Sequence, residues 1–122
     1  MNIAIEMFKL KIEHLMESEH EYDFPEFIRL VRKTTGFSRR FVADRVGCSE
    51  TKILYLEKGD YGTRGPDYQF IVDISHFFGL NGKKMLTKFR KYMTQLRAKI
   101  KSETIEKEIE LSGNSGQLEF WN

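Results

Sequence analysis

The side chains best suited to bind a ligand lie in the middle of the chain, where cationic and hydrogen-bonding residues recur at short spacing. Residues 29–64 carry 9 basic and 4 acidic side chains, and residues 65–101 carry 8 basic and 2 acidic ones. Both ends of the chain are acidic, so the formal net charge of +2 hides this separation. Solvated helix faces account for some of the lysines, but a polyanionic partner explains so local an excess better.

The same residues give little support to catalysis or metal binding. Cys48 has no histidine near it in the sequence that could activate a thiol. His14 and His20 have no second ligand at metal spacing, so exposed or packed histidines are expected rather than a zinc site. The glycines of residues 58–66 do not form a phosphate-binding loop, because no Gly-Lys-Ser/Thr follows them. We therefore expect no enzyme activity, no metal and no cofactor.

The composition predicts a soluble, cytoplasmic protein. Its 122 residues are 40% hydrophobic and 31% charged, which fits one globular domain with a modest core. One cysteine cannot form an internal disulfide, and this agrees with a reducing compartment. The sequence shows no apolar run of membrane-spanning length and no secretory signal at its start.

Two short helices joined by Gly47 must position the polar residues of the middle segment. Ser38 and Ser49 are suited to cap the two helix starts, because a serine hydroxyl accepts a hydrogen bond from a free backbone N–H. A glycine suits the turn, where a positive φ would strain any residue with a Cβ. The second helix has only a narrow apolar stripe, formed by Ile53 and Leu56. The pattern is that of a helix-turn-helix whose second helix presents a polar face to solvent or a ligand.

This stretch resembles the helix-turn-helix of the XRE family, the Cro and lambda-repressor-like proteins. The likeness lies in the small Ala43, in the turn Val-Gly-Cys-Ser at residues 46–49, and in the Ile-x-x-Leu-Glu-x-Gly ending at residues 53–59. It extends over about residues 24–90. The resemblance also puts Cys48 in an apolar position of the turn, so we expect a buried, unreactive thiol.

The resemblance implies an all-α fold, with a five-helix domain similar to lambda repressor at residues 23–92 and helical extensions at both ends. The five helices are expected to start near Pro25, Arg39, Glu50, Tyr68 and Gly82. Residues 1–22 read as an amphipathic helix, because apolar residues recur at helical spacing. These residues are Ile5, Phe8, Ile12 and Leu15. Residues 93–111 continue the last helix, and residues 112–122 form a flexible tail.

A helix-turn-helix of this family implies sequence-specific binding of double-stranded DNA, with the N-terminal half of helix 50–57 in the major groove. Glu50, Thr51 and Tyr55 match base-facing positions; Glu50 can accept from cytosine, and a negative charge there also favours the helix N-terminus. Glu57 is expected to pair within the protein, since phosphate repels a carboxylate. The expected phosphate contacts, which position the protein without reading sequence, are Arg39, Arg40, Lys52, Lys58, Tyr61, Thr63 and Arg64.

A heptad-like stripe in the last helix predicts a homodimer. Its members are Leu86, Phe89, Met93, Leu96 and Ile100. One recognition helix reads too few base pairs to select a site, whereas two-fold pairing places two such helices in successive grooves of a palindromic operator. These features together predict a dimeric transcriptional repressor. The alternative is a monomer in which both terminal helices fold onto their own domain.

A protein-interaction module is the competing interpretation, in which an antitoxin or adaptor keeps this fold mainly to bind a protein partner. Phe41 and Leu54 depart from the family, which usually has polar residues at these positions. The apolar N-terminal helix and the tail segment Leu-Glu-Phe-Trp at residues 118–121 offer surfaces for such a partner. Antitoxins that also repress their own operon would combine both functions.

Overall fold

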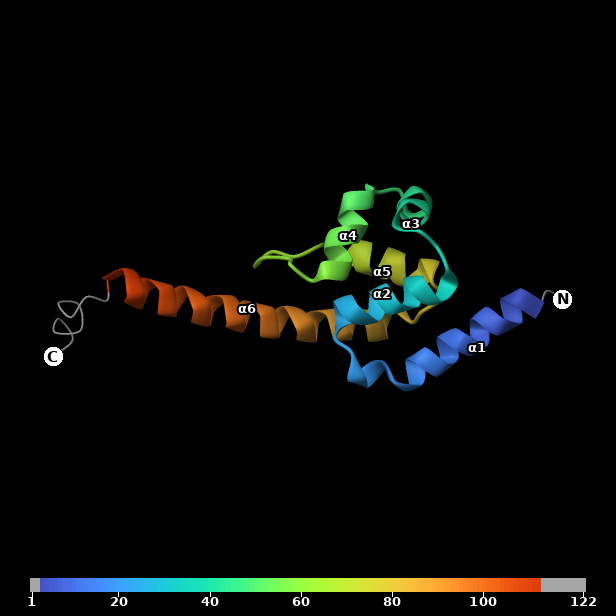
Figure 1. Ribbon diagram of the computed structural model, residues 1–122, viewed down its shortest axis with the longest axis horizontal. Helices are drawn as coiled ribbons and strands as arrows, with labels where there is room; N and C mark the ends of the chain where they lie inside the picture. Colours follow the sequence, from blue (N-terminus) through green and yellow to red (C-terminus); the bar gives the residue numbers. More distant parts are fainter. Residues whose placement is uncertain (1–2, 113–122) are drawn as a thin grey trace.

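Six α-helices and one short 3-10 helix make up residues 3–112, the part of the chain that the computed structural model describes (Figure 1). They are α1 (Ile3–Glu17), η1 (Glu19–Glu21), α2 (Phe24–Thr35), α3 (Arg39–Val46), α4 (Glu50–Lys58), α5 (Tyr68–Phe77) and α6 (Gly82–Ser112). Residues 3–112 contain no strand, so the all-α prediction is confirmed. Each of the five predicted helix starts lies at the observed start or next to it.

Short polar side chains cap the starts of the five domain helices. In each case a side-chain oxygen accepts a hydrogen bond from the backbone N–H three residues later, at 2.9 to 3.1 Å. The capping residues are Asp23, Ser38, Ser49, Asp67 and Asn81. At the start of α2, the carboxylate of Glu26 accepts from Arg29 at 3.0 Å, in place of the reciprocal bond expected of a capping box.

Two glycines fix the ends of α3 and α4. Gly47 has a φ of +85°, and its N–H donates to the Ala43 carbonyl at 2.8 Å, which turns the chain from α3 into α4. Gly59 has a φ of +75°, and a Cβ there would collide with the ring of Pro25 and the hydroxyl of Tyr92. Both positions therefore require the residue that lacks a Cβ.

A single hydrophobic core joins α2 to α6. Fifteen apolar residues with at most 6% exposure form it, and α5 and α6 contribute seven of them with the loop between them. Phe24 of α2 and Phe89 of α6 meet edge to face, with ring centroids 5.3 Å apart. Val46, predicted to be core, packs against this cluster but is only partly buried. The core leaves the α3–α4 end of the molecule free of other elements (Figure 1).

The N-terminal helix α1 lies against the outside of α2 (Figure 1). Ile12, Leu15 and Met16 pack partly buried against the domain core. Met7 and Leu10 are 51% and 64% exposed, so α1 also carries apolar surface that the described residues 3–112 leave uncovered. The side chains of Ile5 and Phe8, which belong to the predicted stripe, lie outside the described set.

The predicted dimer stripe on α6 is in large part intramolecular. Phe89 and Met93 are 1% and 2% exposed because their side chains fill the chain's own core. Leu86 and Leu96 pack partly buried on that core, and Ile100 is also partly buried. The prediction that Phe89 and Met93 contact a second copy is therefore wrong, since the domain needs this half of α6 to close its own core.

The second half of α6 projects beyond the domain (Figure 1). Residues 101–111 are all exposed, and the exposed fractions of Ile105, Ile109 and Leu111 are 47%, 53% and 80%. The helix ends at Ser112, so the predicted tail, with its Leu-Glu-Phe-Trp segment, lies almost wholly outside the described residues. Within residues 3–112, no helix is both long and apolar enough to cross a membrane.

Candidate nucleic-acid interface

Helix α4 has one buried face and one open face, as its sequence pattern predicted. Ile53 and Leu56 are 1% and 2% exposed and anchor the helix in the core. Glu50, Thr51 and Tyr55, predicted to face bases, are all exposed on the opposite side. The exposed fraction of Tyr55 is 53%, so about half of this residue is open to solvent. The helix thus offers hydrogen-bonding and aromatic groups from a rigid base.

A buried ion-pair cluster holds α4 against α2 and α3. Glu57 is 5% exposed, and Arg32 of α2 binds its carboxylate in a bidentate manner, with Nη2 2.9 Å from Oε1 and Nε close to Oε2. Arg39 of α3 donates from Nε to Oε1 at 3.0 Å. Arg32 also donates from Nη1 to the Phe37 carbonyl at 2.9 Å. The predicted internal pairing of Glu57 is confirmed, and the cluster fixes the relative positions of the three helices.

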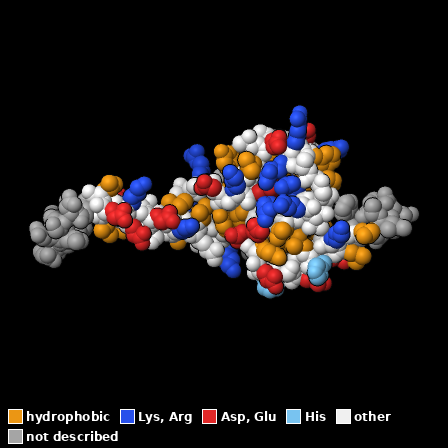
Figure 2. Space-filling model, in the orientation of Figure 1, with side chains coloured by type: hydrophobic (Ala, Val, Ile, Leu, Met, Phe, Trp, Pro, Cys, Tyr) orange, Lys and Arg blue, Asp and Glu red, His pale blue; other side chains and the backbone are white. Residues whose placement is uncertain are grey.

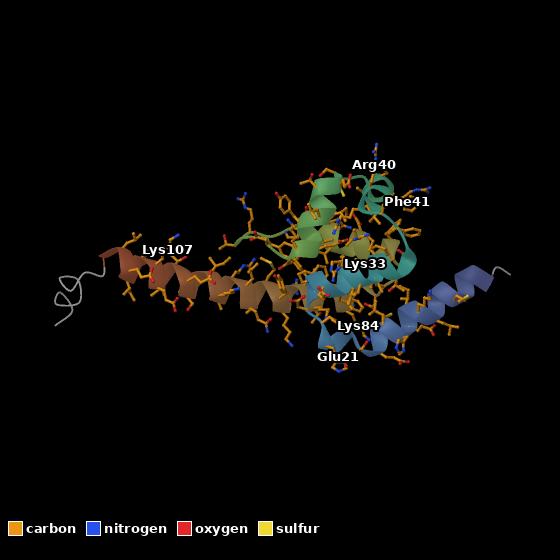
Figure 3. All side chains as sticks on the ribbon, in the orientation of Figure 1. Glu21, Lys33, Arg40, Phe41, Lys84 and Lys107 are labelled. Atoms are coloured by element: carbon orange, nitrogen blue, oxygen red, sulfur yellow. The ribbon has the colours of Figure 1, made fainter. Side chains whose placement is uncertain are left out.

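Four of the predicted phosphate-binding cations lie on the open surface around α3 and α4. Arg40, Lys52, Lys58 and Arg64 are all exposed. Arg40 points away from the body at the end of the molecule that α3 and the start of α4 form (Figure 3). Arg39 is more restrained, because Glu57 holds its Nε and its side chain is 36% exposed. Lys and Arg side chains gather over the helical body in Figure 2.

The loop between α4 and α5 contains three predicted phosphate contacts, of which two are exposed and one is packed against the core. Thr63 and Arg64 are exposed. Tyr61, in contrast, is partly buried; its hydroxyl donates to the Leu56 carbonyl, and its ring lies 6.0 Å from Phe89. Burial raises the pKa of Tyr61 well above its usual range, so the proton stays on the hydroxyl. The prediction of Tyr61 as a phosphate donor is wrong, because that proton is already used within the fold.

The two departures from the expected family pattern lie at half-buried positions. The Phe41 ring stacks on Phe37 at 4.6 Å between centroids, and the Arg45 guanidinium lies 4.8 Å from the Phe41 centroid. Leu54 is likewise partly buried. Phe41 faces outward from α3 (Figure 3), so it contributes both to packing and to the outer surface.

Cys48 lies in the turn between α3 and α4 and is partly buried. Burial raises the pKa of its thiol, although nearby Lys52 opposes this effect. A protonated thiol is a weak nucleophile and a poor metal ligand at neutral pH. In residues 3–112, no cluster of three or more His, Cys, Asp or Glu side chains is arranged to hold a metal ion.

Residues 26–89 match the family model described as a helix-turn-helix domain. The chain belongs to this family. The matched range begins in α2, contains all of α3, α4 and α5, and ends in the buried part of α6. No curated protein and no solved structure matches the chain. The helix-turn-helix domain makes DNA-binding regulation the general function of the chain.

Two arginines of α6 beside the helix-turn-helix domain were not predicted as contact residues. Arg97 donates from Nε to the Thr63 carbonyl at 3.0 Å, and the guanidinium of Arg90 lies 4.7 Å from the ring centroid of Tyr68. Their spacing of seven residues, two helical turns, was visible in the sequence. Both arginines border the apolar stripe of α6, since Arg90 follows Phe89 and Arg97 follows Leu96.

Proposed function

We propose that the chain is a sequence-specific transcriptional regulator of the XRE kind, a dimeric repressor that acts in the cytoplasm and has no enzyme activity. The observation that carries this proposal is the two-sided character of α4. Its buried side holds Ile53 and Leu56, and its open side presents Glu50, Thr51 and Tyr55. A helix of this kind, held after a tight turn, fits the major groove of double-stranded DNA.

Base reading is assigned to the N-terminal half of α4. The Glu50 carboxylate accepts from the N4 amino group of cytosine, and the Thr51 methyl contacts the methyl group of thymine. Tyr55, one turn further along the helix, presents its ring and hydroxyl at the edge of the groove. Each good contact of this type discriminates by about 1–3 kcal/mol against the wrong base.

Backbone binding is assigned to the cations around α4. Arg40, Lys52, Lys58 and Arg64 are exposed, so each is open to a phosphate beside the groove, and the Lys52 ammonium lies 4.2 Å from the ring centroid of Phe70. Arg39 has a fixed role, because the Glu57 carboxylate orients its guanidinium while more than a third of the side chain remains exposed. Thr63 adds an exposed hydroxyl in the loop.

Dimerisation is assigned to the projecting end of α6. Ile105 and Ile109 lie one turn apart on this helix and are about half exposed. An antiparallel pair of such helices would bury Ile105 and Ile109 of both copies in one shared apolar stripe. Two-fold pairing is the commonest arrangement of soluble oligomers, so a second copy is the occupant that we assign to this stripe.

Selection of the purified protein against a pool of random DNA duplexes tests the proposal. The expected result is enrichment of one palindromic motif, with half-sites about one helical turn apart. A matched control, Thr51→Ala combined with Tyr55→Ala, should no longer enrich that motif while it still binds DNA weakly. If the unaltered protein enriches no motif at any salt concentration, the adaptor or antitoxin interpretation replaces this one, and the exposed Met7 and Leu10 become the surface to examine.

A further inference from the structure

Arg90 and Arg97 extend the positive surface of the helix-turn-helix domain onto α6. Both side chains are exposed; Arg97 is held by a residue of the loop after α4, and Arg90 is held by the first residue of α5. Arg97 donates to the carbonyl of Thr63, and Arg90 lies over the ring of Tyr68, at distances of 3.0 and 4.7 Å. The two arginines therefore face the same side of α6 as the loop that follows the recognition helix.

A shallow hollow connects this part of α6 to the recognition helix itself. Lys52 of α4, Arg64 of the loop and Arg97 of α6 line the same hollow, together with Tyr68. The one carboxylate in its lining belongs to Asp67, whose Oδ1 accepts from the Phe70 N–H at 2.9 Å and caps α5. Three cations thus share the hollow with one carboxylate that has a structural role.

We propose that Arg90 and Arg97 bind DNA phosphates just outside the base pairs that α4 reads, so that α6 lengthens the footprint of each recognition helix. This inference rests on the proposed DNA-binding function and adds a second element to its interface. Lys52 projects from the base-reading helix, so a DNA backbone that passes Lys52 and Arg64 runs directly over the hollow that Arg97 lines. A phosphodiester is the ligand that this set of cations suits.

The contacts within the protein prepare both guanidinium groups for this role. The Nε of Arg97 is bound to the Thr63 carbonyl, which restrains the plane of the group and leaves its two terminal nitrogens available to another acceptor. A guanidinium in a fixed plane can donate two parallel hydrogen bonds to one phosphate. The Tyr68 ring restricts Arg90 in a similar way, so less side-chain freedom is lost when a phosphate binds.

The dependence of DNA affinity on salt separates this role from a merely structural one. Arg97→Gln and Arg90→Gln each remove one charge, so each should lower the slope of log affinity against log salt by about 0.9. Arg97→Lys keeps the charge and should keep the slope, although affinity falls because the lysine cannot form the bidentate contact. Base preference should not change in any of the three variants, since phosphate contacts carry no sequence information.

Lys84→Gln is the matched control, because Lys84 is an exposed cation of the same helix on the side away from the α3–α4 end (Figure 3). Its slope should equal that of the unaltered protein. The proposal is overturned if Arg90→Gln and Arg97→Gln also leave the slope unchanged, or if Arg97→Lys and Arg97→Gln lower affinity equally with no change in slope. Failure of the proposed sequence-specific DNA binding would give a different result. The unaltered protein would then show no base preference, regardless of how the salt slopes of the variants compare.

Discussion

Arg32 and Glu57 form a buried bidentate pair between α2 and α4, with Nη2 and Oε1 2.9 Å apart. The pair explains how a polar helix can be held firmly with only Ile53 and Leu56 as its apolar anchors. Arg39 shares the same carboxylate from α3. Loss of Glu57 would therefore loosen α4 and release the Arg39 side chain from its carboxylate partner.

Glu57→Ala should destabilise the domain by about 3–5 kcal/mol, because it leaves the buried guanidinium of Arg32 without its partner. Urea unfolding, followed by circular dichroism, measures this change. Glu26→Ala is the matched control: its pair with Arg29 is partly exposed, so the loss should be at most about 1 kcal/mol. Equal losses for the two variants would show that the buried cluster does not hold α4.

Lys52→Ala and Arg64→Ala should weaken binding to all DNA sequences by similar factors. Both residues are exposed cations beside α4, and each lost phosphate contact should lower the salt slope by about 0.9. Tyr61→Phe is a useful companion, because its hydroxyl is bound to the Leu56 carbonyl and its removal should leave the DNA affinity of the folded protein unchanged. Titrations of fluorescent duplexes at several salt concentrations provide these values, and a loss of affinity for folded Tyr61→Phe would restore Tyr61 to the interface.

The stability of the domain should fall at alkaline pH partly because of Tyr61. Its pKa is raised above the ordinary value of 10.0 by burial, so the folded protein disfavours the tyrosinate that the unfolded chain forms readily. The contribution is fully present below pH 10 and is lost as the pH rises above that value. Tyr61→Phe removes the titrating group. Between pH 10 and 11.5 the free energy of unfolding of this variant should therefore fall less steeply than that of the unaltered protein, and the two slopes should differ by up to about 1.4 kcal/mol per pH unit. Parallel curves for the two proteins would contradict this assignment.

Ile105→Glu combined with Ile109→Glu should convert a dimer into a monomer without unfolding the domain. Both side chains are about half exposed on the projecting part of α6, away from the core. Light scattering should give twice the chain mass of 14.4 kDa for the unaltered protein and the single mass for the variant. A monomer mass for the unaltered protein at micromolar concentration, with and without DNA, would remove dimerisation from the account.

Local signals allowed the helix-turn-helix to be predicted from sequence. Ser38, Ser49 and Gly47 act on backbone groups within four residues, so their roles follow from neighbours that the sequence displays directly. Tyr61 was misplaced because its partners include Phe89 and Tyr92, which only the tertiary fold brings to the loop. The positions that depended on short-range chemistry were predictable, and those that depended on packing across the core were not.

In α6, too, the sequence predicted a local pattern but not the tertiary contacts that the pattern makes. Spacing identified an apolar face on α6, but spacing does not say what covers such a face. The structure covers Phe89 and Met93 with the chain's own core and leaves Ile105 and Ile109 open. The internal pairing of Glu57 was predictable from charge alone, whereas the identities of Arg32 and Arg39 as its partners required the packing of α2 and α3 on α4.

Single-base substitution of the selected operator shows whether the open face of α4 reads base pairs. Affinities of the unaltered protein, Thr51→Ala and Tyr55→Ala would be measured for every single-base variant, with Arg40→Ala as the control that removes a backbone contact. Each α4 variant should lose about 1–3 kcal/mol of discrimination at one or two base pairs, while Arg40→Ala should keep the full pattern at lower affinity. If Thr51→Ala and Tyr55→Ala retain the unaltered pattern of discrimination, α4 is not the element that reads the DNA.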